Sequence, residues 1–193
     1  SVKEVPEAVL AGIRNLVEAM CVLFLAWALG TAIGNLDAAG YLVSALGPAV
    51  PGWLLPTVVF TLSAAIAFAT GTSFGTMAVI IPLAIPLAIA IEPTTTLALA
   101  TSAAVLSGAT WGDHCSPISD TTILSSTGTG CDHAAHVATQ LPYALSAGAV
   151  SILLGTIPAG FGVNPWLLLL LGCFGCAVIV RTLGRHPVAT LSS

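Results

Sequence analysis

The residues best suited to ion chemistry lie in the segment 108–122, which reads GATWGDHCSPISDTT. Its two acids, Asp113 and Asp120, have no lysine or arginine nearby, and the chain around them is strongly apolar. An acid in apolar surroundings is costly unless a cation balances its charge. The segment therefore predicts that a bound metal cation or a proton balances these carboxylates.

Hydroxyl side chains accompany the two acids and predict an oxygen-rich cation site. A hard monovalent cation such as Na+ prefers oxygen ligands. A second hydroxyl-rich stretch, TGTSFGTM at 70–77, offers further oxygen atoms. The expected ion-binding residues are Asp113, Asp120, Ser116, Ser119, Thr121, Thr72, Ser73 and Thr76, together with carbonyl oxygens freed where a helix unwinds.

Such a site would also handle protons. Burial favours the protonated form of a carboxyl group and a bound cation favours the ionised form, so Na+ and H+ compete for one carboxylate. Competition at a site that opens alternately to each side of a membrane gives Na+/H+ exchange. His114 is either a proton relay in this exchange or a neutral histidine bonded to a backbone carbonyl, and both interpretations stay open.

The acids and histidines also allow purely structural roles. Asp120 could be the N-cap of a helix, and Asp113 could be an acid in a loop. Asp132 is the expected cap of a following helix, and His133 and His136 would then mark the start of that helix rather than a site.

Two rival classes of function use the same residues. A possible zinc set consists of His114, Cys115, Cys131, His133 and His136, although its spacing fits no usual structural motif. An intramembrane hydrolase could use Cys115 or Ser116 with a histidine and Asp120, but no oxyanion-hole signature is evident. We interpret the chain as a transporter rather than an enzyme, with no cofactor besides the transported Na+ and H+.

Composition places the chain in a membrane. Only 6% of its residues are charged, 56% are hydrophobic, and the mean hydropathy is +1.02. The uncharged runs 38–91 and 133–180 are each long enough for two crossings of about 20 residues. An all-α membrane protein follows, in contact with membrane lipid and without a nucleic-acid partner.

Basic residues lie only towards the two ends of the chain, at Lys3, Arg14, Arg181 and Arg185. Because basic residues favour the cytoplasmic side of a membrane, we expect both ends on that side and an even number of crossings. The five cysteines follow no secreted-type spacing, which favours reduced thiols. The start at Ser1, without methionine or leader, suggests a part of a longer polypeptide.

Interruptions of the apolar pattern predict the elements that position the site. Within one transmembrane domain, 1–193, we expect a helix at 6–33, an interfacial helix at 36–48, a hairpin at 53–91, a broken helix at 94–128, and helices at 132–158 and 165–183. Glycines and hydroxyls at 70–77 interrupt the hairpin, and Pro117 interrupts the broken helix. Two interrupted segments in a helical bundle indicate the binding site of a secondary transporter, so the two breaks should meet.

Three segments of the chain resemble one known family. They are LAWALGTAIG at 25–34, ATGTSFGTMAVIIPLAIPLA at 69–88 and GDHCSPISDTTILSSTGTGCDHAAHVATQLPYAL at 112–145. They are similar to the C-terminal half of the NhaC-type Na+/H+ antiporter family, over nearly the whole chain. The resemblance implies the ion transporter superfamily fold, in which each of two inverted repeats has a re-entrant hairpin and a discontinuous helix. The hairpin tip would be 70–76 and the break 111–122.

The resemblance also implies an activity and partners. Family members are longer, so this chain would supply one repeat, completed by an N-terminal half of the same transporter or by a homodimer partner. The expected activity is exchange of Na+ for H+ across the cytoplasmic membrane of a bacterium or archaeon. Exchange of an organic acid of the malate or lactate type, coupled to Na+ and H+, is the alternative.

Overall fold

The computed structural model describes residues 50–184 and, before them, only 5–6, 9–10, 24–25, 28, 31–32, 35–36, 41 and 44–45. The expected helices at 6–33 and 36–48 therefore fall largely outside the described residues. The described part is helical and contains no strand, which confirms an all-α protein. Four of its helical stretches are long and apolar enough to cross a membrane: Gly52–Thr70, Ser73–Ile91, His133–Gly160 and Pro165–Thr182.

Helices α3 (Leu55–Thr70) and α4 (Ser73–Ile91) form a hairpin that follows the short 3-10 turn η1 (Gly52–Leu54). The tip consists of Gly71 and Thr72. Gly71 has a left-handed φ of 68°, a conformation that glycine adopts without steric cost. The Thr72 hydroxyl caps α4 by accepting a hydrogen bond from the Gly75 amide at 3.2 Å.

The broken helix consists of α5 (Thr95–Cys115) and α6 (Asp120–Gly128), separated by residues 116–119. Pro117 has no amide hydrogen to donate. The two serines take neighbouring amides away from the helical pattern, because Ser116 Oγ accepts from Ile118 at 3.3 Å and Ser119 Oγ accepts from Thr121 at 3.2 Å. Local hydrogen bonds thus replace the helical ones at the break.

Helices α3 and α5 run parallel and in close contact. A Cβ atom added to Gly108 would lie 2.3 Å from the Phe60 carbonyl oxygen, and one added to Gly112 would lie 2.1 Å from that of Ala64. The two glycines, four residues apart, are a small-residue face of the kind that lets membrane helices approach closely. This contact fixes the broken helix against the first arm of the hairpin.

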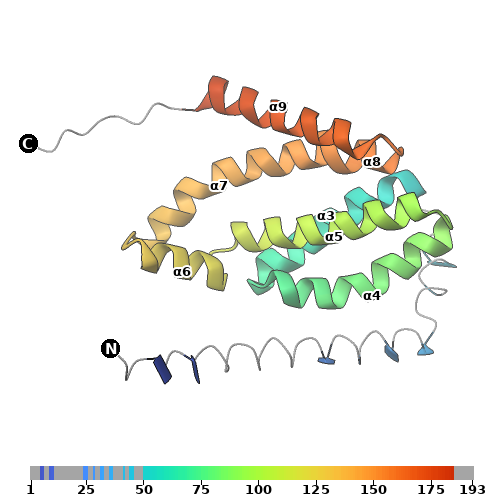
Figure 1. The fold of residues 1–193 in the computed structure, drawn as a ribbon, viewed down its shortest axis with the longest axis horizontal. Helices are drawn as coiled ribbons and strands as arrows, with labels where there is room; N and C mark the ends of the chain where they lie inside the picture. Colours follow the sequence, from blue (N-terminus) through green and yellow to red (C-terminus); the bar gives the residue numbers. More distant parts are fainter. Residues whose placement is uncertain are drawn as a thin grey trace, which may run out of the picture.

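The remaining helices cover the other side of α5. Helix α7 (His133–Val150) continues through the π-helical segment η2 (Ser151–Thr156) into α8 (Ile157–Gly160), and α9 (Pro165–Leu183) follows. Figure 1 shows α7 beside α5 and α6, with α9 outermost. Asp132 caps α7, as predicted, by accepting from the Ala135 amide at 2.8 Å. The structure differs from the continuous helix predicted at 132–158, because residues 151–156 are π-helical.

Candidate ion site at the two breaks

The hairpin tip touches the break in the broken helix. The Ser116 hydroxyl donates to the Phe68 carbonyl at 2.8 Å, and a Cβ atom on Gly71 would lie 2.8 Å from the Ile118 carbonyl oxygen. These contacts confirm the prediction that the two breaks meet. The C-terminal ends of α3 and α5 and the N-terminal ends of α4 and α6 all lie at these breaks, so partial charges of both signs are present there.

Asp113 is the buried acid of the site. It lies in the last turn of α5 and is only 7% exposed. Its Oδ2 accepts a 3.5 Å hydrogen bond from Thr121 Oγ1, which is itself 2.8 Å from Ser119 Oγ. Its Oδ1 is buried with no hydrogen-bond partner among the described residues. An unpartnered buried carboxylate oxygen is costly, which makes this atom the candidate position for a cation or a proton.

Asp120 has different surroundings from Asp113. It is exposed and is the first residue of α6, where the helix dipole favours a negative charge. The N-cap is Ser119, so the interpretation of Asp120 as the cap is wrong. The interpretation of Asp113 as a loop acid is also wrong, because α5 continues to Cys115.

The expected hydroxyl ligands lie on both sides of the contact between tip and break. Ser116, Ser119 and Thr76 are buried, Ser73 is half-buried, and Thr72 and Thr121 are exposed. Thr76 Oγ1 donates its hydrogen to the Thr72 carbonyl at 2.8 Å, much as Ser116 Oγ donates to Phe68. A hydroxyl oxygen that has donated its hydrogen keeps lone pairs that can accept from or coordinate another group.

Several groups at or near the break were not assigned to the ion site from the sequence. The Ile118 carbonyl faces Gly71 and receives no hydrogen bond from a described residue. The His133 ring reaches the Pro117 carbonyl, with Nε2 2.7 Å from the oxygen, and Gln140 Nε2 donates to the His114 carbonyl. Trp111 Nε1 donates to the Ala144 carbonyl at 2.7 Å. Pro117 was the available signal, because a break frees carbonyls that need other donors.

The two rival interpretations find no support at the site. No three His, Cys, Asp or Glu side chains converge on a possible metal position within the described part of the chain, so the zinc set is not assembled. Both nitrogens of His133 are occupied, by Ser126 Oγ and by the Pro117 carbonyl. The Ser116 hydroxyl donates to the Phe68 carbonyl, so the described residues show no bond between it and a histidine. His114 is exposed, and its proton-relay role stays a prediction.

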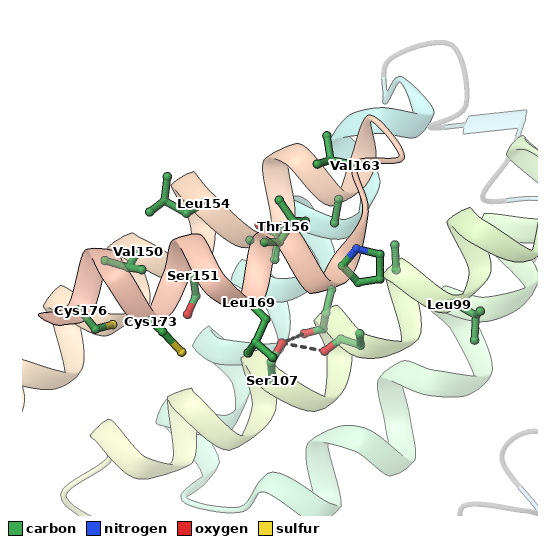
Figure 2. Close-up of a pocket in the computed structure, with 18 of the residues that line it drawn as sticks. Leu99, Ser107, Val150, Ser151, Leu154, Thr156, Val163, Leu169, Cys173 and Cys176 are labelled. Atoms are coloured by element: carbon green, nitrogen blue, oxygen red, sulfur yellow. Dashed lines mark hydrogen bonds between the residues drawn. The ribbon is translucent and has the colours of Figure 1, made fainter.

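A large cavity lies away from the breaks, between α5 and the segment from η2 to α9 (Figure 2). It has a volume of about 950 Å³ and contains no charged side chain. Its polar atoms come from residues such as Ser107, Ser151, Cys173 and Cys176. Without a carboxylate, this cavity cannot balance a cation in apolar surroundings.

Apolar helices, two breaks in contact and a buried carboxylate beside the break of the broken helix define an all-α membrane protein of the type that includes secondary transporters. A family model described as the Na+/H+ antiporter family matches residues 1–159. The chain therefore belongs to the Na+/H+ antiporter family.

Two curated relatives extend this assignment. An uncharacterized protein of Haemophilus influenzae is 44% identical over 161 residues, which cover 83% of this chain and 30% of the relative. A malate-2H+/Na+-lactate antiporter of Bacillus subtilis is 33% identical over 166 residues, which cover 81% of this chain and 33% of the relative. The chain thus spans about a third of the length of these relatives. No solved structure matches it.

Proposed function

We propose that this chain supplies one repeat of an antiporter that exchanges Na+ for H+, with Asp113 as the carboxylate that both ions share. The observation that carries this proposal is the buried Asp113 Oδ1, which has no hydrogen-bond partner among the described residues. The family membership supports Na+ and H+ as the ions. The two bacterial relatives support a bacterial or archaeal cytoplasmic membrane as the location.

The chemistry follows from competition at Asp113. When Na+ is bound, the ionised carboxylate balances its charge, and neutral oxygens of Ser116, Ser119 and Thr76 supply further ligands. When Na+ leaves, a proton on the carboxyl group removes the cost of an isolated buried charge. Either ion can neutralise the site but not both together, so their movements are coupled. In this proposal the exposed Asp120 is not the shared carboxylate. Its negative charge attracts cations to the site.

A complete transporter needs more than this chain. An N-terminal half of the same protein or a second copy of the chain would cover the exposed side of the site and provide alternating access. The name of the Bacillus subtilis relative favours a second candidate function, in which an organic acid of the malate or lactate type is exchanged together with Na+ and H+. Transport, and not a chemical reaction, is the activity in both cases.

Transport assays in proteoliposomes distinguish these functions. The complete transporter, as a dimer of this chain or the longer protein that contains it, is reconstituted with an acidic interior and a pH-sensitive dye. We expect added Na+ to dissipate the pH gradient, and choline at equal ionic strength to leave it unchanged. Dissipation only when malate or lactate is present would instead establish the organic acid exchanger. A gradient that survives every addition would contradict both functions.

A further inference from the structure

Four hydrogen bonds join α7 to the broken helix, and they come from three residues on one face of α7; His133 makes two of them, to Pro117 and to Ser126. His133 and Gln140 contact the break, and the Ala144 carbonyl accepts from Trp111 in α5. Residues seven and eleven positions after His133 point within about 20° of it in an α-helix with 100° per residue. Helix α7 therefore contacts both halves of the broken helix, α5 and α6 (Figure 1).

The two carbonyls bound by α7 are ones that the break deprives of helical partners. In a continuous helix the His114 carbonyl would accept from the Ile118 amide, which here donates to Ser116 Oγ. The Pro117 carbonyl would accept from the Thr121 amide, which here donates to Ser119 Oγ. Gln140 replaces the donor for His114, and His133 replaces the donor for Pro117.

The Ile118 carbonyl, one of those at the break that receive no hydrogen bond from the described residues, lies on the side of the hairpin tip. Ile118 lies between Pro117 and Ser119, yet its carbonyl oxygen receives no hydrogen bond from the described residues and lies against Gly71. Pro117 and Ile118 form a turn in which the Ser119 amide donates to the Ser116 carbonyl at 3.4 Å. His133 holds the Pro117 carbonyl of this turn on the α7 side, while the Ile118 carbonyl lies against Gly71.

The His133 contact with Pro117 is independent of the protonation state of the ring. A carbonyl oxygen only accepts, so Nε2 carries a hydrogen whether the imidazole is neutral or charged. Nδ1, 3.0 Å from Ser126 Oγ, accepts from that hydroxyl when neutral and donates to it when charged. In the charged case Ser126 can still donate to the Ile123 carbonyl at 3.0 Å.

We infer that His133 and Gln140 are positioning residues of the ion site, although neither is placed to touch the ion. They bind the carbonyls on the α7 side of the break and thereby leave Asp113 Oδ1 and the Ile118 carbonyl for the cation. This inference rests on the proposed function, because it assumes that Na+ binds at the break. Residues that orient the ligands of a metal commonly change its affinity 10- to 100-fold when removed.

The test measures Na+ binding directly, through the increase in melting temperature that Na+ causes in the purified transporter, with choline as the ionic-strength control. We expect His133→Ala and Gln140→Ala each to raise the half-maximal Na+ concentration about tenfold or more. His133→Gln keeps an N–H donor for the Pro117 carbonyl and should restore much of the affinity. His136→Ala is the matched control, because the half-buried His136 ring makes no hydrogen bond to a described residue.

Different results overturn the two levels of the proposal. Wild-type Na+ dependence in both His133→Ala and Gln140→Ala would overturn the positioning role and leave the proposed function standing. If Na+ does not change the melting temperature of the wild-type protein, both the proposed site and the positioning role are overturned. If His133→Ala does not fold, His133→Gln decides: a folded variant with tenfold weakened Na+ binding would show that the Nε2 donor is not the feature that matters.

Discussion

The two acids of the broken helix differ in their surroundings although they are only seven residues apart. Asp113 is buried with one oxygen unpartnered, whereas Asp120 is exposed at the start of α6. Charge and spacing alone predict Asp120, at least as much as Asp113, to be the carboxylate that exchanges the ions. Burial favours Asp113 over Asp120 as the shared carboxylate of the proposed exchange, because an isolated charge in apolar surroundings is costly.

Replacing each acid by its amide tests this order. Asp113→Asn keeps the size of the side chain but cannot be ionised, so we expect Na+-driven proton flux in proteoliposomes to fall to background. Asp120→Asn should keep most of the flux, since water and the helix N-terminus already surround that carboxylate. Unchanged size-exclusion profiles would show that both variants fold. Loss of flux in Asp120→Asn with flux kept in Asp113→Asn would show that Asp120, and not Asp113, is the shared carboxylate.

Gly71 offers a second test at the residue scale, with Gly130 as its control. Both have left-handed φ angles, 68° and 66°, but a Cβ atom at Gly71 meets the Ile118 carbonyl while one at Gly130 meets nothing within 4 Å. Each alanine variant should carry about 1–2 kcal/mol of backbone strain. Only Gly71→Ala should also weaken Na+ binding, measured as the half-maximal Na+ concentration for transport. Equal Na+ affinity in the two variants would show that the hairpin tip is not part of the ion site.

At the scale of elements, the contact between α3 and α5 holds the hairpin arm against the broken helix. Gly108 and Gly112 provide a face without side chains, and Ser116 then reaches the Phe68 carbonyl one turn further on. Because membrane helices gain stability from close packing rather than from leaving water, the absence of side chains at these positions matters more than their hydrophobicity. Tip and break meet because this contact sets the register of the two helices.

A methyl group placed in this contact tests its role. Gly112→Ala puts a Cβ atom against the Ala64 carbonyl, and overpacking of this kind typically costs about 1–3 kcal/mol. We expect a lower melting temperature in detergent and reduced transport. Gly172→Ala in α9 is the matched control, because nothing lies within 4 Å of the added Cβ atom there. Equal melting temperatures of the two variants would mean that α3 and α5 can separate without cost.

For the whole molecule, the basic residues near the ends predict that both ends face the cytoplasm. Lys3, Arg14 and Arg185 lie outside the described residues, so the orientation stays a prediction. In a variant without native cysteines, Ser1→Cys and Ser193→Cys should both react with an impermeant maleimide in inside-out vesicles and be protected in right-side-out vesicles. Labelling of the two positions from opposite sides would require an odd number of crossings.

The sequence by itself determined the class of the protein and the place of the breaks. Composition and apolar runs indicate a helical membrane protein, since few charges and long apolar segments leave no other way to satisfy the backbone. Pro117 and Gly71 mark where helices stop, because proline lacks a donor and glycine tolerates the left-handed turn. Those properties are local, and local properties can be read from residue types.

Only the tertiary structure decided which groups at the breaks are free and which are bound. The difference between Asp113 and Asp120 comes from burial by neighbouring helices, which no short stretch of sequence encodes. The choice of His133 and Gln140 as donors depends on how α7 lies against the broken helix, 16 and 26 residues away from the carbonyls they bind. Such contacts are long-range in the chain, and helix packing rather than residue type brings their partners together.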